Sequence, residues 1–456
     1  MKKTNDLGKD SIISLVLKLA IPAMLAQLVN VLYTVIDRMF IGNIPDVGSI
    51  ALAGIGVCGP IAEFIASWGN LIGVGGSVYM AMKMGEGDND KAERILSNGF
   101  SVTLCLAAVL SVVFLLAKEK LLFWFGASSE TFVYANQYLT IYASGAVFAI
   151  TAMSMNYFIT CQGFPSIAMI SVVIGAVTNI FLDYLFVFVM NWQVRGAAFA
   201  TVIAQFCSCM WTLCFLFGKR IHIKIKKHKI EKQIVVQSCK FGLTPFIMYS
   251  TNSVLVIVLN IVLQLHGGEL MGDKLISAAT IIQSYLLVIL NPLGGITAGT
   301  QAIISYNYGA RNFERVKSAI IYICGLAVLF CAVMFVATRF VPVYFVTLFT
   351  KNTEIAELAK WGIKAYTWGL IPLALHYEAT DGLTALGWSK TALVMSAWRK
   401  ITFVILMCVI PLFAAPQMAF ISQSIADIFC STINTVIFVF MMKKILDHDY
   451  NHKVIE

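Results

Sequence analysis

The fold is decided by two glycine-rich stretches that follow one pattern, GVGGSVYMAMKMGEGDNDKAER (residues 73–94) and TAGTQAIISYNYGARNFERVKS (residues 297–318). Shifting the chain by 224 residues places Gly85 on Gly309 and Lys91 on Arg315. The same shift pairs Gly75 with Gly299, Tyr142 with Tyr366, Gly145 with Gly369 and Gly163 with Gly387. One offset kept over about 90 residues indicates an internal duplication.

The composition is that of an integral membrane protein. Hydrophobic residues make up 59% of the 456 residues, charged residues 12%, and the mean hydropathy is +0.81. Soluble domains contain about 25% charged residues, so a soluble protein is excluded. The first apolar run exceeds the roughly 7–15 residues of a cleavable signal peptide, and we expect it to remain as an anchor. The eleven cysteines show no zinc-ligand spacing, so we expect them to serve in packing.

Twelve stretches reach the length of about 20 apolar residues that a membrane span requires. They are centred near residues 27, 66, 107, 146, 178, 206, 252, 291, 328, 370, 402 and 429. Most Lys and Arg residues fall in loops on one side if both termini are cytoplasmic, as the positive-inside rule favours. Six spans separate the two copies of the repeat, so both halves cross the membrane in the same direction. Parallel repeats of this kind are a known plan of secondary transporters.

We therefore predict an all-α integral membrane protein with twelve transmembrane helices in two parallel six-helix bundles, an N-lobe and a C-lobe, around a central cavity. The predicted division is residues 1–218 for the N-lobe, 219–238 for a basic cytoplasmic connector, 239–441 for the C-lobe and 442–456 for a cytoplasmic tail. The connector lies in a run of eight basic residues from Lys219 to Lys240. Because this run follows the loop topology, we expect contact with anionic lipid headgroups and no nucleic-acid partner.

Five prolines lie inside the predicted spans, namely Pro22, Pro60, Pro245, Pro292 and Pro372. Each removes a backbone hydrogen bond and tends to bend its helix. Bent helices are tolerated at membrane depth where they face protein or a water-filled cavity. Packing alone explains any single proline, but the five together favour a bundle that moves around a cavity.

The first span carries a polar stripe. Asn30, Tyr33, Thr34 and Asp37 are spaced i, i+3, i+4 and i+7, so they share one face of a helix. An ionised side chain inside a bilayer costs about 2.5–3.5 kcal/mol on insertion scales. Because the short Asp37 side chain reaches the headgroups poorly, we expect it to face the protein interior. Arg38 lies about 100° further round the helix, and we expect it to reach toward the outer headgroups.

The fifth and sixth spans supply matching polar groups. Asn179 and Asp183 are four residues apart on one helical face, and Thr201 lies near the start of the sixth span. With Asp37 they provide two carboxylates, an amide and a hydroxyl, the oxygen ligands that hard cations prefer. The hypothesis is a cation site for Na⁺ or an exchangeable proton at Asp37, Asn179, Asp183 and Thr201. No cofactor is expected besides this coupling ion.

Other charged residues lie in predicted spans. Asn30, Tyr33 and Glu63 are candidates for a cavity in which a carboxylate attracts a cationic substrate. Glu378 and Asp381 share a helical face in the tenth span and are candidates for the same role. Two interpretations stay open for the latter pair and for Arg399 and Asp427 in the last two spans: structural ion pairing, or a part in substrate or proton binding.

Several motifs together resemble one transporter family. These are Y-x-x-x-D-x-x-F-I-G from Tyr33 to Gly42, the duplicated glycine-rich segment and N-x-x-x-D in the fifth span. Over essentially the whole chain they resemble the multidrug and toxic compound extrusion (MATE) transporters, most closely the prokaryotic branch with its ion site in the N-terminal half. The resemblance implies cation-coupled antiport, a Na⁺/H⁺ site at the four residues named above, and bending of the first helix at Pro22.

The C-terminal half departs from this arrangement. The 224-residue shift places Met407 at the position of Asp183 and an uncharged residue, Asn260, near that of Asp37. The seventh span contains no Asp or Glu. We therefore expect the carboxylate site of the N-terminal half to have no counterpart in the C-terminal half.

The predicted function is export of amphipathic, often cationic, drug-like compounds by a monomeric Na⁺- or H⁺-coupled antiporter in the cell membrane of a prokaryote. The alternative is a lipid-linked oligosaccharide flippase, a distant relative that would need a cationic cavity for pyrophosphate. Cations within the spans are few, namely Arg38, Arg399 and Lys400. We expect no enzyme, because H-E-x-x-H, G-x-S-x-G and P-loop motifs are missing from the sequence.

Overall fold

The computed structural model describes residues 6–42, 44, 47–125, 127, 129–218, 221, 223–347, 349 and 352–455. Residues 1–5 and Lys219, the first residue of the predicted connector, lie outside the described residues. The first six crossings are made by α1 (Ile12–Gly42), α2 (Gly48–Gly85), α3 (Asn89–Trp124), α4 (Ser129–Cys161), α5 (Pro165–Asp183) with the π-helix η1 (Tyr184–Val189), and α6 (Gln193–Leu216). The others are made by α7 (Lys232–Gly309), α8 (Phe313–Phe340), the short α9 (Pro342–Thr347), α10 (Thr353–Tyr366), α11 (Leu370–Ala385), α12 (Ser389–Phe413), η2 (Pro416–Phe420) and α13 (Ile421–Ile455).

The predicted fold class is confirmed. Within the described ranges, eleven helical segments are long and apolar enough to cross a membrane. Two of these, Lys232–Gly268 and Lys274–Gly309, form the arms of α7, whose path departs from helical geometry at Gly268 (φ 61°, ψ −165°). Glycine adopts this backbone conformation without steric cost because it has no Cβ.

The remaining crossing is divided between α10 and α11, each too short to span a membrane alone. The helix breaks at Thr367–Gly369, close to the predicted span centre at residue 370. Thr367 there donates its hydroxyl to the carbonyl of Ile363 at 2.8 Å. Pro372 follows within the first turn of α11, where the missing N–H of proline costs no intrahelical hydrogen bond.

The internal duplication is visible in the backbone. Gly163 and Gly387, which are 224 residues apart, both have φ of 86° in the turns that follow α4 and α11. The same offset relates Gly87 (φ 83°) and Arg311 (φ 53°) in the turns after α2 and α7. Equivalent turns thus keep a residue with left-handed backbone conformation in both halves, even at Arg311, where the first half has Gly87.

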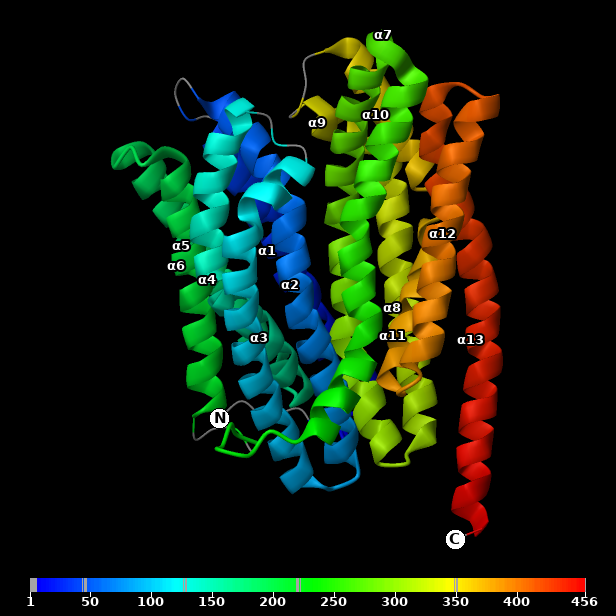
Figure 1. The fold of residues 1–456 in the computed structure, drawn as a ribbon. Coiled ribbons are helices and arrows are strands. Elements are labelled where there is room, and N and C mark those ends of the chain that lie inside the picture. The colour runs from blue at the N-terminus through cyan, green and yellow to red at the C-terminus, as the bar shows by residue number, and fades with distance from the viewer. Residues whose placement is uncertain are drawn as a thin grey trace.

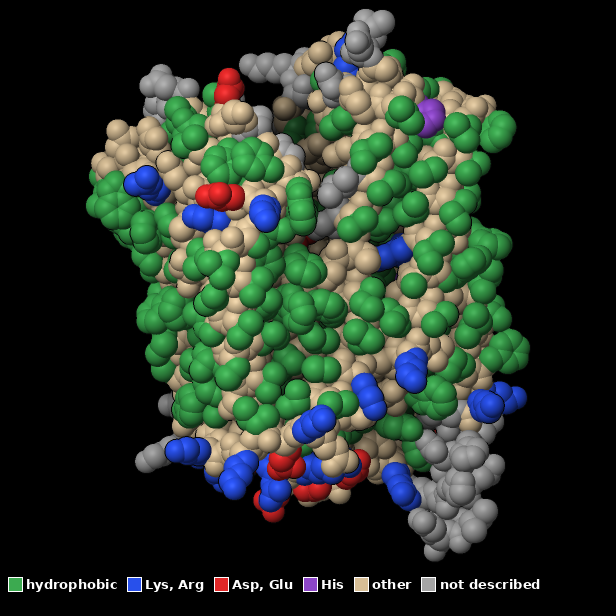
Figure 2. Space-filling model, viewed as in Figure 1, with side chains coloured by type: hydrophobic (Ala, Val, Ile, Leu, Met, Phe, Trp, Pro, Cys, Tyr) green, Lys and Arg blue, Asp and Glu red, His purple; other side chains and the backbone are tan. Residues whose placement is uncertain are grey.

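The two lobes lie side by side, with α1–α6 on one side and α7–α13 on the other (Figure 1). They meet where α2 and α1 pack along α7. The ring of Trp68 on α2 lies 4.8 Å from that of Phe246 on α7, and the hydroxyls of Ser67 and Ser250 are 3.1 Å apart. Apolar side chains cover most of the visible face, and Lys and Arg gather at one end of it (Figure 2). We call this end, which carries residues 6–11 and the connector, the basic end.

Two helices continue into segments that the predicted division assigns to the connector and the tail. Helix α7 begins at Lys232, so the last seven residues of the predicted connector are helical. Helix α13 continues to Ile455, through most of the predicted tail. Lys, Gln and Glu are good helix formers, so a helix does not have to end where its apolar stretch ends.

Candidate cation-binding site

The four predicted cation ligands lie together inside the N-lobe. Helix α1 supplies Asp37, α5 supplies Asn179 and Asp183, and α6 supplies Thr201, and α5 packs against both of the other helices. All four residues are buried, with exposed fractions of 7% for Asp37, 1% for Asn179, 0% for Asp183 and 5% for Thr201. The Asp37 and Asp183 carboxyl groups lie close enough for electrostatic interaction. Asn179 Nδ2 donates to Thr201 Oγ1 at 3.4 Å, and Thr201 Oγ1 donates to the carbonyl of Ala197 at 3.0 Å.

Several oxygens of this site lack a partner. Among the described residues, nothing donates a hydrogen bond to Asp37 Oδ1, Asn179 Oδ1 or either carboxyl oxygen of Asp183. Burying a polar oxygen without compensation is costly, and burying an unpaired charge costs more. The set fits a bound cation or a retained proton, because either would compensate these buried oxygens.

The backbone changes form directly after Asp183. Helix α5 ends at this residue and continues as the π-helix η1. Single π turns inside α-helices occur mostly at functional sites. The turn into α6 then requires left-handed backbone at Asn191 (φ 55°) and Gln193 (φ 50°). The π-helical turn, which is wider than an α-helical turn, therefore lies between the Asp183 carboxylate and the tight loop before α6.

Two tyrosines of α4 complete the site, and the sequence analysis missed them. Tyr138 lies close enough to Thr201 and to Asp37 for polar and electrostatic interaction. Tyr142 interacts with Gln205 of α6. A signal existed, since Tyr138 and Tyr142 are four residues apart in α4, as are Thr201 and Gln205 in α6. Tyrosine is common in apolar helices as a packing residue, so only the four-residue spacing of Tyr138 and Tyr142 could have identified them as site residues.

A cavity of about 330 Å³ adjoins the site. Asn179 and Thr201 belong to its wall, as do the predicted Asn30 and Tyr33. The far side is formed by α7 through Tyr249 and the glycine-rich stretch from Gly294 to Gly299. Among the described residues that line it there is no Lys, Arg, Asp or Glu. The cavity is therefore uncharged, and it extends from the candidate cation ligands to the opposite lobe.

The other predicted acidic residues lie outside this site. Glu63 is an exposed residue of α2 that interacts electrostatically with Tyr142, so it is near the cavity. Glu378 is fully buried in the C-lobe, and neither of its carboxyl oxygens has a hydrogen-bond partner among the described residues. Asp381 accepts a hydrogen bond from Thr297 of α7 at 2.5 Å and lies close enough to Tyr157 and Tyr249 for electrostatic interaction. It therefore faces the boundary between the lobes.

Arg399 and Asp427 form a buried ion pair between α12 and α13. Arg399 Nη1 lies 2.6 Å from Asp427 Oδ1, and Gln423 Nε2 donates to both Asp427 oxygens at 2.9 and 3.0 Å. Of the two interpretations for these residues, the geometry supports structural ion pairing. The predicted anchor Arg38 is exposed on α1, as expected for a side chain that reaches toward headgroups.

Helix α1 runs without interruption through Pro22. The adjacent residue, Ala23, packs against the glycines of α7: an ideal Cβ on Gly295 would lie 2.8 Å from the Ala23 carbonyl oxygen. One helix therefore carries a site carboxylate, Asp37, and also contacts the opposite lobe next to its proline.

Replacing Tyr138 with phenylalanine should weaken the site without dismantling it. The phenol interacts with Thr201, one of the four candidate ligands, and the ring itself is buried. Loss of one buried polar contact costs about 1 kcal/mol, so we expect the cation concentration needed for half-maximal efflux to rise about fivefold. The measurement is the cation concentration that gives half-maximal efflux. The matched control is Tyr134→Phe, one helical turn away, which should leave this concentration unchanged.

A duplicated twelve-crossing bundle with a buried oxygen-rich site beside an uncharged cavity defines a secondary transporter. The sequence model of the MatE family matches residues 22–185 and 250–410, so the chain belongs to the MatE family. The chain is 26% identical over 391 residues to multidrug export protein MepA of Staphylococcus haemolyticus, covering 85% of this chain and 84% of that protein. It is 25% identical over 392 residues to MepA of Staphylococcus aureus strain MSSA476, covering 85% of each.

Solved structures share the fold. One, described as the outward-facing conformation of a multidrug resistance MATE family transporter of the MOP superfamily, has a TM-score of 0.90 at 20% identity over 98% of this chain and 100% of that chain. A MOP superfamily transporter from Pyrococcus furiosus, described as having a binding pocket of reverse polarity, has a TM-score of 0.90 at 20% identity, covering 97% and 99% of the two chains.

Proposed function

We propose that this protein exports amphipathic, often cationic, drug-like compounds in exchange for an inward flow of Na⁺ or H⁺. The observation that carries the proposal is the buried pair of Asp37 and Asp183 beside a cavity that reaches the opposite lobe. Asp37 Oδ1 and both carboxyl oxygens of Asp183 lack hydrogen-bond partners among the described residues. Membership in the MatE family and the similarity to MepA multidrug export proteins support the substrate class.

The proposed cation ligands are Asp37, Asn179, Asp183 and Thr201. A cation or proton at this site would neutralise carboxylate charge that is otherwise buried without compensation. Because Asn179 and Thr201 also line the cavity, occupation of the site changes the polar wall that a substrate meets. Glu63 and Asp381 are proposed to attract cationic substrates, since both lie near cavity-lining tyrosines. The buried Glu378 is proposed as a group that holds a proton.

Coupling is proposed to pass along α1. This helix carries Asp37 in its outer half and contacts Gly295 and Gly299 of α7 through Ala23, next to Pro22. Bending at Pro22 would alter that contact and move Asp37 relative to Asp183. A cation shifts such an equilibrium only if it binds one conformation more tightly than the other.

The proposed topology places the basic end in the cytoplasm, with residues 1–218 and 239–441 as the two transporting lobes of a monomer in the plasma membrane. The positive-inside rule supports this orientation, because Lys and Arg gather at that end (Figure 2). Contact with anionic lipid headgroups is proposed for the same surface.

Flux driven by one ion gradient at a time tests the function. We expect everted membrane vesicles that contain the protein to accumulate ethidium when a Na⁺ gradient or a pH gradient is imposed, and to lose this activity when the gradient is collapsed. Ethidium movement that ignores both gradients would contradict coupled antiport. The flippase alternative predicts instead movement of a lipid pyrophosphate, which a cavity without Lys or Arg among its described lining residues disfavours.

A further inference from the structure

The segments that precede the first helix of each lobe are both held by the opposite lobe. Residues 6–10 precede α1 of the N-lobe and contact the ends of α7 and α8 in the C-lobe. Residues 226–231 precede α7 of the C-lobe and contact α3 in the N-lobe. Helices α3 and α8 are equivalent in the internal repeat, so the arrangement occurs twice.

The first of these contacts, the N-terminal clasp, consists of residues 6–10 with Asn307 and Arg315. Arg315 Nη2 donates to the carbonyl oxygens of Leu7 at 3.1 Å and Asp10 at 2.7 Å. Asn307 Nδ2 donates to the Leu7 carbonyl at 3.0 Å, and Arg315 Nε donates to Asn307 Oδ1 at 2.9 Å. Asn307 and Leu7 are buried, with exposed fractions of 0% and 4%. A charged, part-buried donor thus fixes the start of the N-lobe to the C-lobe.

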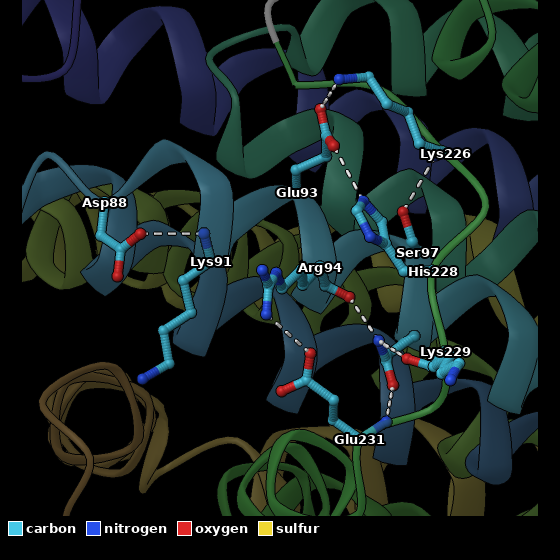
Figure 3. Close-up of polar contacts among 10 residues, drawn as sticks. Asp88, Lys91, Glu93, Arg94, Ser97, Lys226, His228, Lys229 and Glu231 are labelled. Carbon is cyan, nitrogen blue, oxygen red and sulfur yellow. Dashed lines mark hydrogen bonds and ion pairs between the residues drawn. The ribbon is translucent and has the colours of Figure 1, made fainter.

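The second, the connector clasp, consists of residues 226–231 with Glu93, Arg94, Ser97 and Asn98 of α3. Figure 3 shows these contacts. Asn98 Oδ1 accepts from the backbone N–H of Glu231 at 2.6 Å, and Asn98 Nδ2 donates to the carbonyl of Lys229 at 3.3 Å. Glu93 lies 2.7 Å from Lys226 Nζ and 2.9 Å from His228 Nε2. Glu231 directly precedes α7, so this clasp fixes the start of the C-lobe to the N-lobe.

Between the clasps the lobes meet in a reciprocal glycine contact. A Cβ added to Gly85 at the end of α2 would overlap the carbonyl oxygen of Tyr306, and one added to Gly309 would overlap that of Met82. Met82 and Tyr306 are related by the same 224-residue offset as the two glycines. The contact therefore lies on the twofold axis that relates the lobes, and no side chain fits at either position while the lobes are closed.

We infer that the two clasps are latches that hold the lobes closed at the basic end, and that both must release before the cavity opens there. The inference uses the alternating access of the proposed function. Separation of the lobes at this end must break the glycine contact, and it must also break bonds that cross from each leading segment to the other lobe. Opening is then a single cooperative step, because the same movement strains both clasps.

The test is backbone hydrogen–deuterium exchange on the full-length protein with Arg315→Ala. We expect about tenfold faster exchange at residues 71–76 of α2, because the lost hydrogen bonds to a charged donor shift the closed–open equilibrium. These residues pack against residues 238–242 of α7, at a different part of the lobe interface. The matched control is Lys317→Ala, an exposed cation on the same helix, which should behave like the unmodified protein.

Gly85→Leu places a side chain in the glycine contact and so forces the lobes apart. Its exchange rates give the reference pattern for a protein that is open at the basic end. Faster exchange at residues 71–76 in both variants supports the inference. Faster exchange confined to residues 6–16, or no change, would overturn it. If Arg315→Ala does not yield monodisperse protein, Arg315→Lys is measured, because it keeps the charge but loses the planar donor geometry. Hydrogen–deuterium exchange measures closure of the lobe interface and requires no transport. Failure of the proposed ion coupling would therefore appear only in the vesicle experiment.

Discussion

Asp183→Asn is expected to abolish drug efflux while leaving expression unchanged. Asp183 is fully buried and lies close enough to Asp37 for electrostatic interaction, and neither of its carboxyl oxygens has a hydrogen-bond partner among the described residues. Asparagine has nearly the same shape, so packing around the residue is preserved. The charge that balances a bound cation or carries a proton is lost, and we expect at least about a hundredfold loss of coupled flux, since removing a charge-assisted contact costs several kcal/mol.

The measurements are growth in the presence of ethidium in a transporter-deficient host, and ethidium efflux from the same cells. Asp37→Asn should give the same result, because both carboxylates belong to one site. Asp90→Asn is the matched control, since Asp90 is an exposed carboxylate in the first turn of α3 and should retain full resistance. Full resistance of either site variant, at normal expression, would refute the assignment.

Asp427→Ala is expected to destabilise the protein strongly. It leaves Arg399, with an exposed fraction of only 8%, buried without its carboxylate partner at 2.6 Å. Removing one member of a buried ion pair costs about 3–5 kcal/mol, because the remaining charge is uncompensated. Thermal unfolding of the detergent-solubilised protein measures this loss.

The double variant Arg399→Met, Asp427→Leu distinguishes the two interpretations of this pair. Apolar replacement of a buried ion pair is often neutral for stability, so the double variant should recover most of what Asp427→Ala loses. If the pair is structural, efflux should recover together with stability. Recovered stability without efflux would instead indicate a part in substrate or proton binding.

Much of the fold follows from residue patterns alone. Length and apolarity predict the positions of the spans, since a helix in lipid must satisfy its own backbone hydrogen bonds. Helical spacing likewise places Asn30, Tyr33 and Asp37 on one face, and the structure brings Asp37 close to Asp183. The span positions and the shared helical face are local features, so a single sequence contains them, whereas the contact between Asp37 and Asp183 depends on how α1 and α5 pack.

Features that depend on distant partners were not predictable in this way. The Arg315 contact with Leu7 joins residues 308 positions apart, and the Lys226 contact with Ser97 joins residues 129 positions apart. Nothing in either segment indicates which distant helix it meets. Tyr138 was missed for a related reason: a tyrosine in an apolar helix is ordinarily a packing residue, and only its proximity to Thr201 on another helix makes it part of the site.

The π-helical turn after Asp183 has a consequence for how this region can vary between related proteins. A π turn holds one residue more than an α turn, so deletion of one residue from Tyr184–Val189 converts it to regular α-helix. In an ordinary helix the same deletion would rotate everything on one side of it by about 100° relative to the other. The segment between the buried carboxylate of Asp183 and the loop before α6 can therefore lose one residue without a change in the relative orientation of the helical parts on either side.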